Sequence, residues 1–318
     1  MTVLQYTLIG LVVFLFLLNQ VYNYLSGKKF VRDYLHYFLT TKKSLKYWDN
    51  YCANNPNQSD IIVSFSTIPS RISEIVPTVK SLLSQRLAPK KIHLYVPQMS
   101  MREKVGYVIP EEIKDLKCLE VKRVDKDWGP STKFIPAVES LNADQKILVV
   151  DDDNMYPRTM LTAFDKASDE KPEWIVAASG WRVPDDLVDR STTLWTNITK
   201  QAPVPVPTTR VNDYYPIDIV QGYSGFLIRP KFFNFKELTD YPEEPRAVRF
   251  VDDVWVSAHA LVPKYVFPSG RFCYIPFWTE GFFKANSLAS INNHGKERDE
   301  DRNNSIALRY FEDKWHKD

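Results

Sequence analysis

An apolar segment that ends in three consecutive carboxylates constrains this chain of 318 residues more than any other feature. Residues 147–150 are all apolar, which predicts a buried strand, and Asp151, Asp152 and Asp153 follow directly. Ligands of open α/β sheets bind at the carboxyl ends of the strands. Adjacent carboxylates repel one another unless a cation lies among them, and Mg²⁺ and Mn²⁺ prefer oxygen ligands. Because side chains alternate along an extended chain, we expect Asp151 and Asp153 to share a metal; a solvated acidic turn is the alternative.

Further strands are predicted on either side of a helix in the first half of the chain. Apolar runs at 61–67, 91–96 and 119–124 predict three strands, and residues 72–85 have helical spacing. Together with the strand at 146–150 they predict a mostly parallel, Rossmann-like α/β sheet flanked by helices. The first strand is followed by no Gly-x-Gly-x-x-Gly, and the sequence has no Gly-Lys-Ser/Thr loop. Dinucleotide oxidoreductases and P-loop enzymes are therefore disfavoured.

A lysine stands in an unusual position before the fourth strand. Gly129 and Pro130 predict a turn, and Ser131 and Thr132 are candidate caps of a following helix. Lys133 would then lie in the first helical turn, where the helix dipole disfavours a cation. We therefore predict that Lys133 binds an anion such as a phosphate; an exposed surface lysine is the alternative.

Two motifs in the second half are candidates for substrate binding and catalysis. Residues 221–230 place glycines around Ser224, and glycine allows the backbone to approach a ligand closely, although packing can require the same residues. Asp252 and Asp253 open a predicted helix. Acids at a helix N-terminus are stabilised by its dipole, and one of them is also a candidate general base. In the polar stretch that starts at Asn292, His294 is a candidate metal ligand or a structural histidine.

The N-terminus predicts a membrane anchor. Residues 1–27 carry no charged side chain, and about 3–21 reach the roughly 20 residues that cross a bilayer. Tyr22 and Tyr24 would lie in the interfacial aromatic belt. A cleaved signal peptide or a buried core helix are the alternatives. Lys28, Lys29 and Arg32 follow the span and no basic residue precedes it, which favours a cytoplasmic catalytic domain.

Other features constrain the compartment and the partners less strongly. Asn-x-Ser/Thr triplets at Asn57, Asn197 and Asn303 would matter only in the lumen of the endoplasmic reticulum or Golgi, which is the alternative location. The formal net charge of +2 gives no bulk electrostatic reason to bind nucleic acid. Three cysteines cannot build a disulfide framework, and their spacing predicts no zinc site.

These motifs together resemble the GT-A type glycosyltransferases, close to the family-2-like nucleotide-sugar transferases, over about residues 60–294. The resemblance is carried, in order, by Ser-Phe-Ser-Thr-Ile-Pro-Ser-Arg, Asp-Trp-Gly-Pro-Ser-Thr-Lys, Val-Asp-Asp-Asp, Gln-Gly-Tyr-Ser-Gly-Phe and Asp-Asp-Val-Trp-Val-Ser. It implies a hexosyltransferase that moves a sugar, with inversion, from a UDP-linked donor to a hydroxyl of a glycan, lipid or protein acceptor, with Mn²⁺ or Mg²⁺. The expected organisation is an anchor at 1–27, a stem at 28–59, the GT-A domain at 60–295 and a polar tail at 296–318.

The resemblance also implies a role for each matching residue. Nucleotide or phosphate binding falls to Thr67, Pro69, Arg71, Thr132, Lys133 and Asp152. The donor-sugar and acceptor site falls to Gly222, Tyr223, Ser224 and Gly225, and metal binding to Asp151 and Asp153. His294, proposed above from its residue type, would be a third metal ligand. Asp253 matches the catalytic base, with Asp252 as the alternative. The triple Asp is a departure from Asp-x-Asp, so the metal-binding pair stays open.

Two other functions remain open at this point. A nucleotidyltransferase also uses an Asp pair and a metal, but it would want a Gly-rich basic loop after the first strand, and residues 66–71 contain no glycine. A non-catalytic scaffold or binding protein would be indicated by loss of the acids, and both acidic clusters are present.

Overall fold

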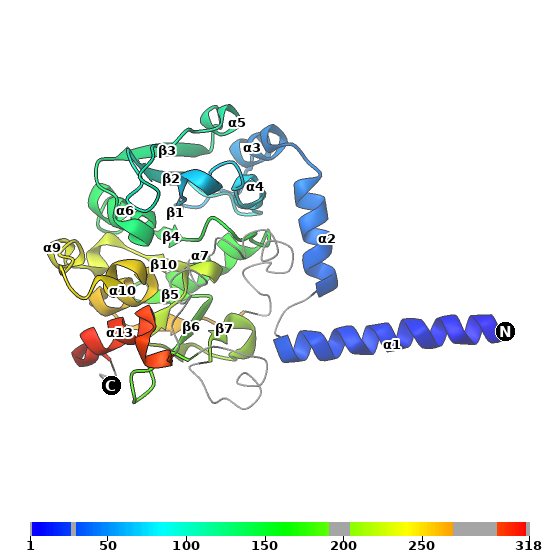
Figure 1. Cartoon of the computed structure of the whole chain (residues 1–318). Coiled ribbons are helices and arrows are strands. Elements are labelled where there is room, and N and C mark those ends of the chain that lie inside the picture. Colours follow the sequence, from blue (N-terminus) through cyan, green and yellow to red (C-terminus); the bar gives the residue numbers. More distant parts are fainter. Residues whose placement is uncertain (1, 27–29, 191–203, 270–297, 316–318) are drawn as a thin grey trace.

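The segment before the three aspartates forms β4 (Ile147–Val149), near the middle of an eight-stranded sheet (Figure 1). This computed structural model describes residues 2–26, 30–190, 204–269 and 298–315. The strand order is β3-β2-β1-β4-β10-β5-β11-β8. The bounds are β1 Ile62–Ser66, β2 Lys91–Pro97, β3 Leu119–Val124, β5 Ile175–Ala177, β8 Tyr215–Pro216, β10 Phe226–Ile228 and β11 Lys264–Val266.

Pairing in this sheet is mostly parallel. Strands β1, β2, β3 and β4 pair in parallel, and so do β5 and β11. Strand β10 lies antiparallel between β4 and β5, and β8 is antiparallel to β11. A second sheet has the order β7-β6-β9, with bounds Val206–Pro207, Ser179–Trp181 and Ile219–Val220. The predicted fold class, a mostly parallel sheet flanked by helices, is confirmed.

Both faces of the large sheet are buried, which explains why β4 is apolar throughout. Leu148 and Val150 belong to the hydrophobic core on one face, and Ile147 and Val149 to the core on the other. The first core includes side chains of α3 (Leu45–Ala53), α4 (Val76–Leu83) and α7 (Met160–Glu170). The second includes side chains of α6 (Ile135–Ser140), α9 (Phe235–Leu238), α10 (Asp252–His259) and α13 (Asn303–Tyr310). A four-residue helix, α5 (Glu111–Lys114), precedes β3.

The N-terminal helices differ from one another in what they pack against. Helix α1 (Val3–Ser26) contains a stretch, Val3–Tyr22, that is long and apolar enough to cross a membrane, with a mean hydropathy of 1.8 and none of it buried. Helix α2 (Phe30–Thr41) packs on α4, and α3 buries Leu45, Trp48 and Cys52. The C-terminal part of the range expected as a stem therefore contributes to the core. The sequon at Asn197 lies outside the described residues.

Candidate active site

A cleft of about 1060 Å³ opens at the carboxyl ends of β1 and β4, which is the sheet edge where the sequence predicted a ligand. Its volume is in the range of small-molecule sites. Five segments far apart in the sequence meet there: the ends of β1 and β4, the 3₁₀ turns Pro69–Arg71 and Gly129–Lys133, and the start of α10. The sheet topology brings these segments together, because parallel strands end at the same edge.

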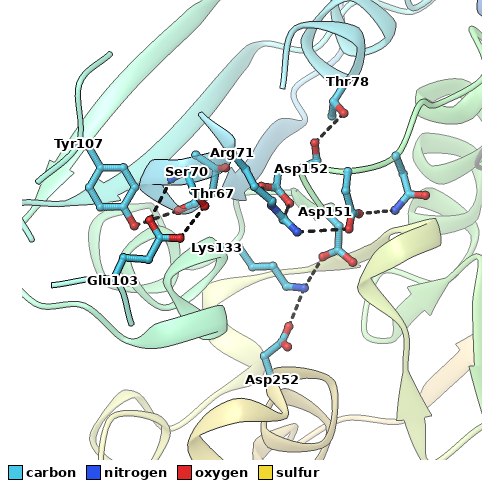
Figure 2. Close-up of polar contacts among 12 residues, drawn as sticks. Thr67, Ser70, Arg71, Thr78, Glu103, Tyr107, Lys133, Asp151, Asp152 and Asp252 are labelled. Atoms are coloured by element: carbon cyan, nitrogen blue, oxygen red, sulfur yellow. Dashed lines mark hydrogen bonds and ion pairs between the residues drawn. The ribbon is translucent and has the colours of Figure 1, made fainter. Parts of the chain in front are cut away.

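Lys133 connects the end of β4 to α10 (Figure 2). Its Nζ lies 2.6 Å from Asp151 Oδ1 and 2.6 Å from Asp252 Oδ2, and the side chain is buried. Burial acts to lower the pKa of Lys133, but Asp151 and Asp252 outweigh it and hold the pKa well above its usual range. Lys133 is therefore a buried, charged residue at the floor of the cleft, and not the exposed surface lysine of the alternative.

A second buried cation, Arg71, holds Asp152. The Arg71 guanidinium forms a two-pronged contact with the Asp152 carboxylate, in which Nε donates to Oδ2 at 3.2 Å (Figure 2). Thr78 Oγ1 donates to the Asp152 backbone carbonyl at 2.8 Å. Arg71 Nη1 also lies 3.6 Å from Asp153 Oδ2. Lys133 thus pairs with Asp151, whereas Arg71 pairs closely with Asp152 and at a longer distance with Asp153.

Asp153 is the least neutralised of the three acids. Burial, followed by repulsion from Asp152 and Asp151, raises the pKa of Asp153 to about 7. Its Oδ1 accepts a hydrogen bond from Asn154 Nδ2 at 2.8 Å. A carboxylate whose ionisation is opposed in this way is stabilised by an added cation.

A divalent metal fits the chemistry of this site. Seven aspartates line the cleft, five of them from residues 151–153 and 252–253, against five lysines and arginines, of which Arg71 and Lys133 are buried. Carboxylate oxygens such as those of Asp151 and Asp153 are of the kind that Mg²⁺ and Mn²⁺ take as ligands. Within the described ranges no three His, Cys, Asp or Glu side chains converge as a complete metal site. The expected third ligand, His294, lies outside the described residues.

Asp253 and Asp252 occupy different environments although they are adjacent. Asp252 faces Lys133, whereas Asp253 Oδ1 accepts a hydrogen bond from the Gly222 backbone N–H at 3.0 Å. Burial, followed by repulsion from Asp252, raises the pKa of Asp253 well above the ordinary aspartate value. Both side chains line the cleft. Asp253 has a raised proton affinity, and Lys133 forms its ion pairs with Asp252 and Asp151 instead, so Asp253 is the better placed of the two to accept a proton.

The glycine segment contributes two residues to the site and two to the packing beneath it. A Cβ on Gly222 would lie 2.4 Å from Lys133 Nζ and 2.9 Å from Asp151 Oδ1, so any other side chain there would have to displace that ion pair. Tyr223 lines the cleft, and its hydroxyl donates to Ser179 Oγ at 2.9 Å. Ser224 is buried, and Gly225 has a φ of +90° against the core. We find no contact of these last two with the cleft.

Three residues near the cleft lie differently from what the sequence predicted. Lys133 ends a 3₁₀ turn rather than starting an α-helix, because Phe134 separates the turn from α6. Thr132 Oγ1 accepts from the Trp128 backbone N–H at 2.9 Å and donates to Asp127, so it shapes the loop and does not line the cleft. Pro69 begins the 3₁₀ turn that presents Arg71, and it lies outside the cleft lining.

Several cleft residues were missed by the sequence reasoning. The cleft is also lined by Arg102, Tyr107, Lys126, Trp128, Tyr241 and Arg249. Glu103 ties the loop that carries Arg102 and Tyr107 to the 3₁₀ turn before α4, because it accepts a hydrogen bond from Ser70 Oγ at 2.6 Å (Figure 2). Tyr107 likewise donates to the Thr67 carbonyl at 3.0 Å. Only Trp128 carried a signal, since it stands within the Asp-Trp-Gly-Pro motif; the loop residues follow no pattern.

The chain is similar in structure to several solved proteins. A mannosyltransferase from Pyrobaculum calidifontis in complex with GDP-Man and Mn²⁺ matches 92% of this chain and 81% of its own, with 14% identity and a TM-score of 0.41. GalNAc-T7 with UDP, GalNAc and Mn²⁺ matches 65% of this chain and 41% of its own, with 12% identity and a TM-score of 0.39. A 4-diphosphocytidyl-2C-methyl-D-erythritol synthase matches 72% of this chain and 98% of its own, with 12% identity and a TM-score of 0.38.

No protein-family model and no curated protein sequence matches the chain.

Proposed function

We propose that this protein is a metal-dependent glycosyltransferase that moves a sugar from a nucleotide-sugar donor to an acceptor hydroxyl with inversion. One observation carries the proposal: buried Lys133 joins an aspartate at the end of a central strand to an aspartate at the start of α10, on the floor of a ligand-sized cleft. Phosphate-binding cations and a proton-accepting carboxylate thereby lie in one cleft. The motifs that resemble GT-A enzymes, Val-Asp-Asp-Asp and Asp-Asp-Val-Trp-Val-Ser, supply these aspartates.

The donor diphosphate is the natural partner of the two buried cations. Lys133 and Arg71 remain charged because carboxylates surround them, and both line the cleft. Asp151 and Asp153 would hold the divalent metal, which would neutralise charge developing on the departing nucleoside diphosphate. We assign the donor as UDP-linked on the family resemblance alone. Thr67, whose carbonyl is fixed by Tyr107, lines the nucleotide end of the cleft in this proposal.

Asp253 would take the proton of the acceptor hydroxyl. Its raised pKa gives it a stronger affinity for that proton than an exposed aspartate has, and the Gly222 N–H orients one of its oxygens. Asp252 would position the Lys133 ammonium through their ion pair and would not receive the proton. Attack from the side opposite the leaving group, with a carboxylate as base, inverts the anomeric centre.

The apolar N-terminal helix would anchor the enzyme as a single-pass membrane protein. Its stretch Val3–Tyr22 has the required length, and the lysines that follow favour a cytoplasmic catalytic domain. The location can be tested on the sequons at Asn57 and Asn303. We expect neither to be glycosylated in a eukaryotic host, and glycans at these sites would place the domain in the secretory lumen instead.

The activity test uses the purified full-length chain with a panel of nucleotide sugars, with Mn²⁺, with Mg²⁺ and with EDTA. We expect release of a nucleoside diphosphate that depends on the metal and on one class of donor. The same protein should be given nucleoside triphosphates and sugar phosphates. Pyrophosphate release in that arm, without turnover of any nucleotide sugar, would overturn the proposal in favour of a nucleotidyltransferase.

A further inference from the structure

Helix α2 has its polar side chains turned toward the protein and its large apolar side chains turned away from it. Asp33 and Thr40 are only 2% and 1% exposed. The opposite face carries side chains that are 42% to 62% exposed: Val31, Tyr34, Leu35, Phe38 and Leu39. Their spacing of three and four residues places them on one side of the helix. This arrangement reverses the usual one, in which the apolar face packs on the core.

The polar face of α2 is fixed to the catalytic domain by hydrogen bonds. His36 Nε2 lies 3.2 Å from the Tyr156 backbone carbonyl, and Lys80 Nζ donates to the Thr41 carbonyl at 3.1 Å. Trp48 Nε1 donates to the Thr40 carbonyl at 2.8 Å. The helix is therefore held in its orientation by the domain, and its apolar face is not free to rotate inward.

The place of α2 in the chain identifies what covers this face. Helix α1 ends at Ser26 and α2 begins at Phe30. Four residue steps span at most about 14 Å, so a membrane-spanning α1 leaves α2 close to the bilayer surface. Figure 1 shows α2 running across the line of α1, along the side of the domain. A helix in that position lies along the membrane plane when α1 crosses it.

The residues after α2 have the charge that a phospholipid surface attracts. Lys42, Lys43 and Lys46 are exposed directly beyond its C-terminus. Lys42 lies over the Phe38 ring and Lys43 over the Tyr47 ring, so these cations border the apolar face. Apolar side chains flanked by lysines and tyrosines are the composition of helices that lie in the membrane interface.

We propose that α2 is an interfacial helix whose apolar face, residues 31, 34, 35, 38 and 39, inserts into the phospholipid bilayer and fixes the catalytic domain against the membrane surface. The inference rests on the proposed anchoring by α1, but it predicts a second, separate membrane contact. His36 on the polar face contacts the Tyr156 backbone carbonyl, and the Tyr156 hydroxyl hydrogen-bonds with the backbone of Asp151. Tyr156 therefore links α2 to the aspartates at the end of β4.

Spin labels in the full-length chain test the proposal. A single cysteine for labelling replaces Leu35 in α2, Leu11 in α1 or, as an exposed control away from α2, Leu261. The background is Cys273→Ser, and the remaining cysteines, Cys52 and Cys118, are buried. The chain is reconstituted in phosphatidylcholine nanodiscs with and without phosphatidylglycerol. We measure the accessibility of each label to oxygen, which partitions into lipid, and to a water-soluble nickel chelate.

We expect the oxygen-to-nickel ratio at position 35 to exceed that at position 261 several-fold, and to rise further with phosphatidylglycerol. A water-like ratio at position 35, with a lipid-like ratio at position 11, would overturn the proposal while leaving the anchor intact. Water-like ratios at both positions would overturn both. Dipolar broadening between labels at position 35 of neighbouring copies would assign the apolar face to a dimer and also overturn it. Sugar transfer is measured separately, so its absence leaves this result unaffected.

Discussion

Lys133 Nζ lies 2.6 Å from Asp252 Oδ2, and this ion pair joins the edge of the sheet to the first turn of α10. The same nitrogen contacts Asp151 at the end of β4. The cation therefore separates two carboxylates that would otherwise face each other in a buried space, and it is the element that makes the two acidic motifs one site.

We expect Lys133→Met to abolish sugar transfer and to lower the free energy of unfolding by about 3–5 kcal/mol, because removal of one partner leaves buried charges uncompensated. Chemical denaturation and transfer assays measure the two effects. Lys146→Met is the matched control, since Lys146 is equally buried and pairs with Asp60, Asp165 and Asp169 outside the cleft. It should lose stability and keep activity. Transfer at the wild-type rate in Lys133→Met would refute the proposed role of the cation.

Asp253→Asn should retain donor binding but reduce kcat by about 10²–10⁴, because a general base contributes a factor of this size. The amide side chain can still accept the hydrogen bond from the Gly222 N–H, so the loop keeps its position. Asp252→Asn should instead raise KM for the donor, since Asp252 positions Lys133. Steady-state kinetics with donor titration separate the two. If the two variants exchange these effects, Asp252 is the base.

The parts of the site that depend on local pattern could be predicted from the sequence. An unbroken apolar run indicates a strand buried on both faces, and acids after it must lie at the carboxyl edge, so the location of Asp151–Asp153 followed from four neighbouring side chains. The pairing of Lys133 with Asp252 did not follow, because it depends on how α10 packs against the 3₁₀ turn Gly129–Lys133. Such pairing is decided by long-range packing that no local periodicity records.

The orientation of the apolar face of α2 likewise could not be predicted from local sequence. Residues 31, 34, 35 and 38 have a helical spacing that any reader of the sequence can find. An apolar stripe usually indicates the side that packs on the core, and here it is the exposed side. The reversal depends on what the polar face meets, namely the Tyr156 carbonyl and α4.

Gly222→Ala should reduce transfer by about 10²-fold, because displacement of a catalytic group by about 1 Å has an effect of this order. The added methyl would lie 2.4 Å from Lys133 Nζ, which must then move away from Asp151. Gly106→Ala is the control, since its Cβ would approach nothing closer than the Gln98 carbonyl at 3.4 Å. Thermal unfolding should show that both variants fold. Equal activity of both would contradict the proposed crowding at Gly222.

The stability of the metal-free protein should fall between about pH 4 and pH 7 partly through Asp153. Burial and the neighbouring aspartates raise the pKa of Asp153 from 3.8 to about 7 in the folded state, so the folded protein binds this proton more tightly than the unfolded chain. Its contribution to stability is therefore complete below pH 3.8 and is lost as the pH rises through about 7. Asp153→Asn, which cannot ionise, should lose less stability over this range.

Thermal unfolding at pH 5 and pH 8 measures this difference. The proteins compared, all treated with EDTA, are the wild type, Asp153→Asn and the exposed control Asp115→Asn. The gain of Asp153→Asn over wild type should appear at pH 8 and shrink at pH 5, whereas Asp115→Asn should follow wild type at both. Mn²⁺ should stabilise wild type more at pH 8 than at pH 5, because a ligand carboxylate must release its proton before it binds metal. Stabilisation of Asp153→Asn by Mn²⁺ to the same extent as wild type would exclude Asp153 as a metal ligand.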